Sequence, residues 1–525
     1  MTDFLQSINP ATGEVVYRVR KTSPQEVEFH VQTARTGFGQ WQNQPLRDRI
    51  DCVKRVKALL IERSDLFADM ITKEMGRPRT EALVLELSAS LDVMDYYIRK
   101  GPVLLKEKTV PVHNLLFKFR ESRYLTQPLG VLGIITPWNW PLLIPLGCIV
   151  PALIAGNGIV FKPSEYTPGT GQMIRQLFLD AGVPEDVFQA VQGHGDVGQA
   201  LVLSDVEKLF FTGSTEVGQK IMEQAAHNLK PVVLELGGHD PAIVCNDANL
   251  ESTTSGLVWG SFCNAGQNCN GVERIFVQED VLDLFVKKFV QKVSQLRLGD
   301  GMLPDSDMGA LALEKELIKM EAIIQNAVRD GSEILVGGKR KESLGKQFFE
   351  PTVLLHPNRQ TMPEDCEYFG PVVILIPFSD DEEAIAMANC SEFGLTASVW
   401  SQNRKRSKMI ASRLEAGTVM INDVIVSFGI PESDWTGVKK SGVGWVHGEK
   451  GLDEMVNKKF LHRNRLSRSQ NFWWFPYEKS MSTGIGFGHI YLYHASRIQK
   501  MKALIRTLLT FFPYLLINRT KKTKL

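Results

Sequence analysis

The chain has 525 residues, 43% of them hydrophobic, and this length exceeds what one hydrophobic core usually supports, so two or more domains are expected. Its 60 basic and 59 acidic residues nearly cancel, which argues against a nucleic-acid-binding protein driven by overall charge.

The seven cysteines are odd in number, widely scattered and without the C-x-x-C spacing of metal sites. We therefore expect a reducing compartment and no metal centre. The N-terminus begins Met1-Thr2-Asp3-Phe4 and lacks a basic segment followed by an apolar run. The sequence thus predicts a cytoplasmic protein without a secretory signal.

From Pro24 to about Leu91, charged and apolar positions alternate as in amphipathic surface helices. No charged residue occurs from Tyr124 to Phe161, a length that could indicate a transmembrane span, but prolines and glycines interrupt this stretch. We interpret it as a buried strand from Val131 to Thr136, a loop, a buried helix from about Leu142 to Ala155 and a strand from Gly158 to Lys162.

Further strand-like runs alternate with helical patterns such as that from Gly169 to Ala181. This alternation indicates a parallel α/β sheet of the dinucleotide-binding kind. A second series beyond Gly238 implies another α/β unit, with a cleft between two lobes. The runs of the two series are Phe188–Val191 and Lys208–Phe211, then Ala242–Cys245, Arg274–Val277, Val372–Pro377, Ser398–Trp400 and Thr418–Asn422.

The composition changes after residue 461. Residues 462–525 carry 12 Lys and Arg against one acidic residue, a net charge of +11. They include the aromatic cluster 472–475, the uncharged run from Thr507 to Asn518, and the basic end 519–524. The run is too short to cross a bilayer and contains Pro513. A basic amphipathic extension lying on an anionic membrane surface is expected, and packing on a partner subunit is the alternative.

Cys269 is the most informative cysteine. It follows Asn264-Ala265-Gly266-Gln267, small and polar residues that suit a turn with open access to the sulfur, as a reactive thiolate requires. Cys263 is the rival nucleophile, but it follows Ser261-Phe262 and looks packed. The ordinary interpretation of a free cysteine, a small buried hydrophobe, fits the other six.

Two further polar side chains stand in apolar surroundings. Glu235 ends the apolar run 231–234, where partial burial would raise its pKa toward the range of a general base; a solvent-facing strand end is the alternative. Asn139 lies between Trp138 and Trp140. It either caps the helix that starts at Pro141 or donates to an oxyanion.

Two glycine-containing segments are candidates for binding a phosphate. In Phe211–Gly218 a strand ends and a helix begins, so backbone N–H groups and the helix dipole would face a pyrophosphate. Gly193–Gly198 matches G-x-G-x-x-G but lacks the acidic residue about twenty positions further on. We interpret the second segment as a structural turn.

In combination, Pro137-Trp138-Asn139, Glu235-Leu236-Gly237-Gly238 and Gly266-Gln267-Asn268-Cys269 resemble the motifs of the aldehyde dehydrogenase superfamily, and the 34-residue separation of Glu235 and Cys269 agrees with it. The resemblance covers about residues 5 to 460. It implies that Cys269 is the nucleophile, that Glu235 is the base, and that Asn139 is an oxyanion donor.

The resemblance also implies NAD as cofactor, with NADP left open. Lys162-Pro163-Ser164-Glu165 would bind the adenosine ribose, and a carboxylate at Glu165 would repel the 2′-phosphate of NADP. Glu367-Tyr368-Phe369-Gly370-Pro371 would hold the nicotinamide ribose. The expected cofactor-binding residues are Thr136, Trp138, Lys162, Ser164, Glu165, Gly213, Ser214, Gly218, Glu367 and Phe369.

On this resemblance we expect an α/β, aldehyde dehydrogenase-like fold. Residues 1–235 would form a Rossmann-type cofactor domain that includes an oligomerisation hairpin near 110–128, and residues 236–430 a second α/β domain with the catalytic cysteine. Residues 431–461 would return to the cofactor and oligomerisation region, and 462–525 would be the basic, apolar tail. The assembly would be a homodimer or a homotetramer.

The implied reaction oxidises a small-molecule aldehyde to its carboxylate through a thiohemiacetal and a thioester on cysteine. Where the family usually reads Pro-Phe-Gly-Gly-x-Lys-x-Ser-Gly, this chain has Asp434–Gly442, a segment that borders the substrate entrance in relatives. The substrate class is therefore not transferred. The tail favours a hydrophobic or lipid-derived aldehyde. The alternatives are a succinate-semialdehyde-type dehydrogenase, a cysteine acyl-transferase or thioesterase without nicotinamide, and a catalytically silent scaffold on membranes.

Overall fold

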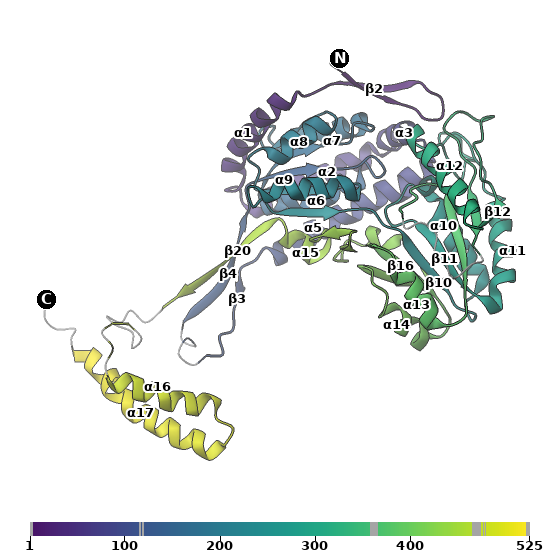
Figure 1. Cartoon of the computed structure of the whole chain (residues 1–525). Helices are drawn as coiled ribbons and strands as arrows, with labels where there is room; N and C mark the ends of the chain where they lie inside the picture. Colours follow the sequence, from purple (N-terminus) through teal and green to yellow (C-terminus); the bar gives the residue numbers. More distant parts are fainter. Residues whose placement is uncertain are drawn as a thin grey trace. The chain divides into compact units, whose positions relative to one another are not determined.

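The structure is a computed structural model that describes residues 4–114, 117, 120–356, 366–464, 474, 475, 477 and 479–520. Phe472 and Trp473 of the aromatic cluster and the basic end at 521–524 lie outside the described residues. The chain divides into two compact units (Figure 1). The first comprises Met1–Lys106 and Thr126–Lys458, and the second Glu107–Leu125 and Lys459–Leu525.

The first unit contains a six-stranded sheet of the expected Rossmann type, in the order β19-β9-β8-β5-β6-β7. All neighbouring pairs are parallel except β19 and β9. The chain runs from β5 outward to β6 and β7, then returns to β8 and β9 on the other side, so the strand order reverses next to β5. The strands are β5 (Val131–Ile135), β6 (Gly158–Lys162), β7 (Phe188–Ala190), β8 (Lys208–Thr212), β9 (Val232–Glu235) and β19 (Gly442–Val443).

Side chains alternate along each strand, so each buried strand presents apolar residues on both faces of the sheet. Helices cover both faces. In β5, Leu132 and Ile134 belong to one hydrophobic cluster, together with residues of α2, α5, α6 and α7. Val131 and Ile135 belong to another, with residues of α1, α8 and α9. The helices are α1 (Pro24–Trp41), α2 (Leu46–Glu62), α5 (Ala89–Leu104), α6 (Leu143–Ala155), α7 (Pro168–Asp180), α8 (Gly195–Leu203) and α9 (Thr215–Ala226).

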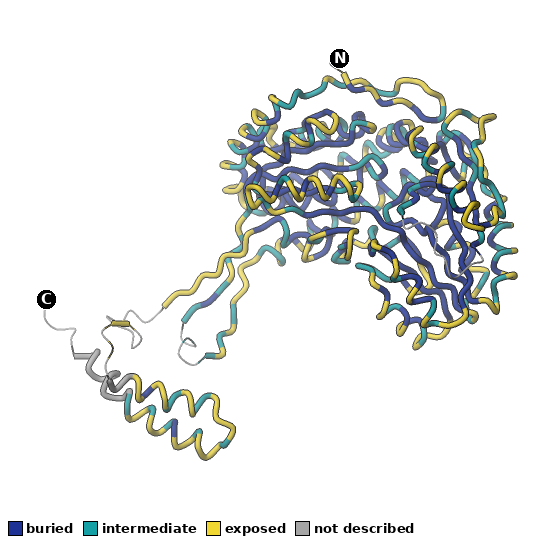
Figure 2. Tube along the Cα trace, in the orientation of Figure 1, coloured by how far each residue is buried: buried dark blue, intermediate teal, exposed yellow. Residues whose placement is uncertain are grey.

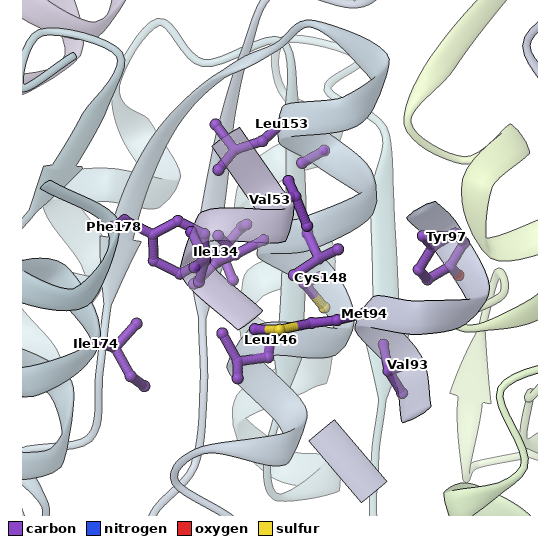
Figure 3. Close-up of a cluster of buried hydrophobic side chains, with 14 of the residues drawn as sticks. Val53, Val93, Met94, Tyr97, Ile134, Leu146, Cys148, Leu153, Ile174 and Phe178 are labelled. Carbon is purple, nitrogen blue, oxygen red and sulfur yellow. The ribbon is translucent and has the colours of Figure 1, made fainter. Parts of the chain in front are cut away.

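Helix α6 explains the long uncharged stretch. Every residue of α6 is buried. Figure 3 shows its residues Leu146, Cys148 and Leu153 among apolar side chains that include Val53 and Phe178. A helix that is apolar on all sides belongs in the core of a large domain, so the prediction of a buried strand, helix and strand in this stretch is confirmed.

The N-terminal part of the first unit holds several shorter elements. Ser23 caps α1 in a reciprocal pair, its backbone N–H donating to the Glu26 carboxylate at 2.7 Å, with Pro24 in the first turn. The π-helix Ala82–Ser88 was not expected, and such segments are frequent at functional sites. The remaining elements of this part are β1 (Phe4–Ile8), β2 (Val15–Arg20), α3 (Ser64–Met75), α4 (Arg79–Glu81) and η1 (Ala82–Ser88). Near the C-terminal end of the unit, α15 (Gly448–Asp453) contacts α5 and α6.

A second sheet of seven strands, in the order β12-β13-β14-β11-β10-β16-β17, confirms the second α/β unit. Only the β12–β13 pair is antiparallel. Its five inner strands are buried over most of their length (Figure 2), whereas the edge strands β12 and β17 are partly exposed. They are β10 (Asp240–Val244), β11 (Val272–Gln278), β12 (Glu333–Val336), β13 (Thr352–Leu355), β14 (Val372–Phe378), β16 (Thr396–Trp400) and β17 (Thr418–Ile421).

Helices and short elements complete this second lobe, and one hydrophobic cluster joins them to the sheet. They are α10 (Leu250–Phe262), η2 (Cys263–Gly266), η3 (Glu279–Val281), α11 (Leu282–Val293), α12 (Glu314–Arg329), α13 (Asp381–Asn389), β15 (Phe393–Gly394), α14 (Arg404–Ala411), η4 (Val426–Gly429) and β18 (Val438–Lys439).

The second compact unit contains a three-stranded sheet and a helical hairpin. The sheet has the order β20-β4-β3, with β3 (Lys108–Thr109), β4 (Glu121–Pro128) and β20 (Val456–Arg463). The hairpin consists of α16 (Lys479–Tyr493) and α17 (Arg497–Thr520), which pack on each other. Among the helices in the described part of the chain, none is both long and apolar enough to span a bilayer.

Candidate active site

Two cavities meet at Cys269. A cavity of about 550 Å³ lies between the two lobes of the first unit, and a second of about 220 Å³ lies on the other side; Cys269 lines both. Eleven of the thirteen predicted site residues line the larger cavity, and the two that do not are Glu235 and Gly218. The eleven are Thr136, Trp138, Asn139, Lys162, Ser164, Glu165, Gly213, Ser214, Cys269, Glu367 and Phe369.

The carboxyl ends of the parallel strands form one wall of the larger cavity. Thr136 follows β5, Lys162 ends β6, and Gly213 follows β8. In open parallel sheets, ligands bind where the strand order reverses, outside the carboxyl ends. The wall therefore lies where a Rossmann-type sheet places a dinucleotide.

Helix α9 begins at this wall. Ser214 is its N-cap, with its hydroxyl accepting from the Val217 N–H at 3.5 Å, and both residues line the cavity. The helix N-terminus thus presents backbone donors and a positive dipole end, as a phosphate site requires. Gly218 has a different role, because a Cβ there would lie 2.4 Å from Leu236 Cδ2. It allows α9 to pack closely against the loop after β9.

The G-x-G-x-x-G string has two parts. A Cβ on Gly193 would lie 2.2 Å from Val197 Cγ2, which agrees with the predicted structural turn. Gly195 and Gly198, however, are in the first turn of α8 and line the larger cavity. The interpretation as a turn alone is therefore incomplete.

The region around Lys162 carries charge into the cavity. Lys162 Nζ lies 3.7 Å from Glu165 Oε2, and burial lowers the pKa of this lysine. Lys315 and Lys319 of α12 also line the cavity. The sequence reasoning missed these two, because nothing in a surface-type helical pattern marks the face that turns toward a cavity. The buried Thr136 hydroxyl has no hydrogen-bond partner among the described residues.

A strained turn presents Cys269. Asn264, Ala265 and Gly266 have φ values of 52°, 53° and 72°, so three consecutive residues adopt the left-handed conformation. Glycine is required at Gly266, because a Cβ there would lie 2.1 Å from Gly370 O. Similarly, a Cβ at Gly238 would lie 2.3 Å from Cys269 O. Both close approaches lie within the second lobe and pack its loops tightly around the cysteine.

Hydrogen bonds hold this turn in place. The Asn264 N–H donates to the two Glu81 oxygens at 3.1 and 3.0 Å, and Asn264 Nδ2 donates to Gln267 O at 3.1 Å and to Asn139 O at 3.2 Å. Asn139 Nδ2 donates to Gln267 O at 3.1 Å. Asn139 is 2% exposed and lines the larger cavity. One of its two amide hydrogens is engaged, which leaves a second donor.

The Cys269 thiol is surrounded by acidic groups. Burial, with further contributions from Glu235, Glu367 and Asp240, raises its pKa well above the usual range. In the state described here the sulfur is therefore a protonated thiol, although the sequence reasoning expected a thiolate. A positive charge in the larger cavity would favour the thiolate.

Glu235 ends β9 and is 3% exposed. Its Oε1 accepts a hydrogen bond from the Trp435 indole N–H, and its Oε2 has no partner among the described residues. Burial raises its pKa to about 8, in the direction expected for a base. The contact with Trp435 was missed. The sequence shows only that tryptophan stands at position 435 where the family usually has phenylalanine. This difference does not reveal that the indole contacts Glu235.

Glu367 and Phe369 lie on a loop that hydrogen bonds fix. The backbone N–H groups of Tyr368 and Phe369 donate to Glu273 at 2.8 Å each, and the Gly238 N–H donates to Glu367 Oε1 at 3.2 Å. Burial raises the pKa of Glu367 to about 8. The ring of Phe369 packs edge-on against Trp138, with ring centres 5.5 Å apart. The loop thus brings a carboxyl group and an aromatic ring to the cavity.

The sequence analysis did not predict which residues line the smaller cavity, apart from Cys269. Apolar side chains from the π-helix, α6, α10 and η4 form most of its wall, and exposed Asp92 is its one charged residue within the described chain. No lysine or arginine lines it in that part of the chain. The apolar residues are Val84, Leu85, Ala89, Trp140, Leu143, Ile144, Trp259, Ile425, Val426 and Phe428.

The fold and the site define an α/β enzyme with a dinucleotide-type cavity and a cysteine at its inner end. The profile of the aldehyde dehydrogenase family matches residues 2–461. The chain belongs to this family, which confirms the predicted resemblance, the fold class and an aldehyde-oxidising enzyme.

Individual relatives agree with this assignment. Mitochondrial succinate-semialdehyde dehydrogenase from Oryza sativa subsp. japonica is 35% identical, over 87% of this chain and 86% of the relative. The 4,4'-diapolycopene aldehyde oxidase from Methylomonas sp is 32% identical, over 91% of this chain and 89% of the relative. The structure of Mycobacterium tuberculosis aldehyde dehydrogenase complexed with NAD+ has a TM-score of 0.83 and 32% identity, over 88% of this chain and 95% of that one.

Proposed function

We propose that this enzyme oxidises a hydrophobic aldehyde to its carboxylate with NAD, through a covalent intermediate on Cys269. The observation that carries the proposal is the position of Cys269, which lines both a dinucleotide-type cavity and an apolar cavity. A sulfur at this junction can attack a carbonyl group that enters from one side while a hydride acceptor occupies the other.

In the first step the Cys269 thiol releases its proton to water and its sulfur forms a bond to the aldehyde carbon. The carbonyl π electrons move to oxygen and give a thiohemiacetal anion. The free amide hydrogen of Asn139 and the Cys269 backbone N–H are the donors for this oxyanion. Collapse of the anion re-forms the C=O bond, expels hydride and leaves a thioester on the sulfur.

The residues of the larger cavity fit NAD. The α9 N-terminus with Gly213 and Ser214 suits the pyrophosphate, Lys162, Ser164 and Glu165 suit a ribose, and Glu367 suits the second ribose. The unpartnered Thr136 hydroxyl and Trp138 and Phe369 remain for the nicotinamide end. When bound, the cofactor supplies the hydride acceptor. Glu165 disfavours a 2′-phosphate, whereas Lys162 leaves NADP as the alternative.

In the second step Glu235 takes a proton from water as the water oxygen bonds to the thioester carbon. The C–S bond then breaks, and the electron pair returns to Cys269 as thiolate. This step consumes the thioester, one water molecule and the Glu235 carboxylate. It gives the free acid product, protonated Glu235 and the Cys269 thiolate, so atoms and charge balance. Glu235 must reach the cavity for this step, because its resting position lies outside both linings.

The apolar lining supports a hydrophobic substrate. Each buried CH₂ contributes about 0.8 kcal/mol, roughly fourfold in binding, so an alkyl chain gains affinity with length. A succinate-semialdehyde-type activity is supported by the name of the rice relative, but the carboxylate of that substrate needs a cation, and no lysine or arginine lines the smaller cavity in the described part of the chain. The name of the Methylomonas relative supports a hydrophobic aldehyde. A nicotinamide-independent acyl-transferase leaves the larger cavity without a use.

A panel of aldehydes with NAD and with NADP tests this proposal. We expect NADH formation with kcat/KM at least about tenfold higher for a medium-chain alkanal than for succinate semialdehyde. Cys269→Ser should abolish the reaction with every aldehyde. A preference for succinate semialdehyde would contradict the substrate class, and aldehyde-independent thioester hydrolysis alone would favour the acyl-transferase.

We further propose that the C-terminal extension docks on an anionic membrane surface. Ile498, Met501, Ile505 and Leu508 recur every three or four residues of α17 and are 69%, 60%, 54% and 56% exposed. They form an apolar stripe on a helical hairpin that is mostly exposed (Figure 2). An exposed apolar stripe beside basic residues is typical of a helix that lies in the membrane interface.

Co-sedimentation with vesicles tests this docking. The exposed Arg497 and Lys502 lie on the same helix, and each basic residue near an anionic surface contributes about 1 kcal/mol. Arg497→Glu with Lys502→Glu should lower binding to phosphatidylserine-containing vesicles at least about tenfold. Arg404→Glu with Lys405→Glu, an equal double change at exposed residues of α14, should not. Equal binding of all three proteins contradicts the proposal, and a change of subunit assembly instead points to a partner subunit.

A further inference from the structure

Trp435 makes the contact that sets the resting position of Glu235. The Trp435 side chain is 0% exposed, and its backbone pairs with Val446 in both directions, at 2.8 and 2.9 Å. Its indole N–H donates to Glu235 Oε1, and Phe428 packs edge-on against its ring at 5.0 Å. The donor is therefore held from both sides.

In this position Glu235 is engaged by Trp435. It lines neither cavity, and its second oxygen has no partner among the described residues. A general base must come within hydrogen-bond distance of its water. The Glu235 side chain therefore leaves Trp435 at some stage of the reaction, and before that stage it is kept out of the cavity where a thiohemiacetal anion forms.

We propose that Trp435 is a positioning residue that holds Glu235 aside during hydride transfer and releases it for thioester hydrolysis. This inference rests on the proposed role of Glu235 as the base. An indole N–H can only donate, so it stabilises the ionised carboxylate over the neutral acid. Phenylalanine, the usual residue at this position of the family pattern, keeps the aromatic ring but has no donor.

The ionisable groups near Glu235 have pKa values that are well separated from its own. The groups that interact electrostatically with it are Cys148 of α6 and Cys269, and burial raises the pKa of both thiols, that of Cys148 to about 12. Neither thiol therefore titrates near the pKa of Glu235, which is raised to about 8 by burial and lowered in part by the Trp435 hydrogen bond. Loss of that hydrogen bond should move the titration to higher pH.

The test is the pH dependence of thioester hydrolysis in Trp435→Phe, with Trp445→Phe as a matched change in the same segment. The burst of NADH measures the active fraction of each protein, and the steady-state rate is divided by the burst amplitude. We expect the acid limb of this rate to move up by about one pH unit in Trp435→Phe and not in Trp445→Phe. The burst rate, which reports hydride transfer, should be lower in Trp435→Phe than in Trp445→Phe, because the Glu235 side chain is no longer held aside.

An unchanged acid limb in Trp435→Phe, or an equal shift in both variants, would overturn the positioning role. Failure of the base assignment has a different signature. If Glu235→Gln hydrolysed the thioester at the wild-type rate with the same acid limb, then the limb would belong to another group. The two failures are therefore distinguishable in one set of pH profiles.

Discussion

Glu235, Glu367 and Cys269 are three acids in one buried region, and their ionisations oppose each other. Burial raises the pKa of each carboxyl to about 8, and the carboxylates in turn raise the pKa of the thiol. At neutral pH the carboxyls are mostly protonated. The region thus carries little negative charge at rest. A nearby positive charge or an entering water molecule would lower these pKa values and favour ionisation.

The pH dependence of turnover follows from Glu235. Its carboxylate form takes the proton from water, and the pKa of this group is raised to about 8, so the base is mostly inactive below that pH and active above it. Where hydrolysis limits turnover, kcat should rise about tenfold per pH unit from pH 6 and level off above pH 8 to 9. Steady-state rates with a saturating alkanal measure this limb. A flat profile from pH 6 to 9 contradicts the base role.

Asn139 should matter for the chemical step more than for binding. In Asn139→Ala the oxyanion loses a side-chain donor, while the backbone oxygen that accepts from Asn264 remains. Removal of such a donor usually lowers kcat about a hundred- to a thousand-fold. We expect that loss in kcat with KM changed less than about threefold, measured by NADH formation. Iodoacetamide alkylation of Cys269 at the wild-type rate would show that the site is intact.

If Asn139→Ala instead retained more than about a third of the wild-type kcat, the amide would only hold the turn through Gln267 O. That is the structural alternative to its role as a donor.

At the scale of elements, the turn before Cys269 is the most constrained piece of the chain. Its two left-handed residues other than glycine, Asn264 and Ala265, cost conformational energy, which the bonds to Glu81 and Gln267 offset. The turn joins α10 to β11 and fixes the sulfur at the junction of the cavities. A strained turn of this kind tolerates little change in its backbone.

Gly266→Ala tests this constraint, and Gly39→Ala is the matched control. The new Cβ at Gly266 meets Gly370 O and the residue has a φ of 72°, so we expect a loss of at least about 2 kcal/mol and of most activity. A Cβ at Gly39 in α1 meets nothing within 4 Å, so alanine should stabilise by about 0.5–1 kcal/mol. Thermal unfolding compares the two. Equal shifts would contradict the assignment of strain to the turn.

The periodicity of apolar residues predicted most of the helices and strands that were named from the sequence. It does so because a helix or strand that is buried on one or both faces needs apolar residues at regular positions. The strand at Val131 and the helix that ends at Ala155 agree with expectation to within one residue. The π-helix Ala82–Ser88 was missed, because its sequence carries an ordinary helical pattern. Its role in lining the smaller cavity depends on the packing of the lobe and not on local preference.

At the scale of the whole molecule, the candidate site could be predicted as a set of motifs but not as a network. A glycine turn before a helix indicates a phosphate site, and a cysteine after small polar residues indicates a nucleophile. Eleven of the predicted residues line one cavity. The Trp435–Glu235 contact joins residues 200 positions apart, and the Lys315 position depends on how α12 packs. Such contacts are set by tertiary structure, which one sequence does not display.

The two α/β lobes contain the residues that we propose as nucleophile, base and oxyanion donor, while the second compact unit carries the extension that we propose docks on a membrane surface. The domain boundaries, the hairpin near 110–128 as an oligomerisation element, and a homodimer or homotetramer remain predictions. Size measurement of the full-length protein by light scattering checks the assembly, with a monomer contradicting it.

The most direct measurement is to trap the acyl enzyme. Glu235→Gln is mixed with a medium-chain alkanal and NAD, quenched in acid, digested and analysed by mass spectrometry. We predict close to one acyl group per chain, located on Cys269, together with one equivalent of NADH. Absence of the adduct, or its location on Cys263 or another cysteine, would contradict the assignment of Cys269 as the nucleophile.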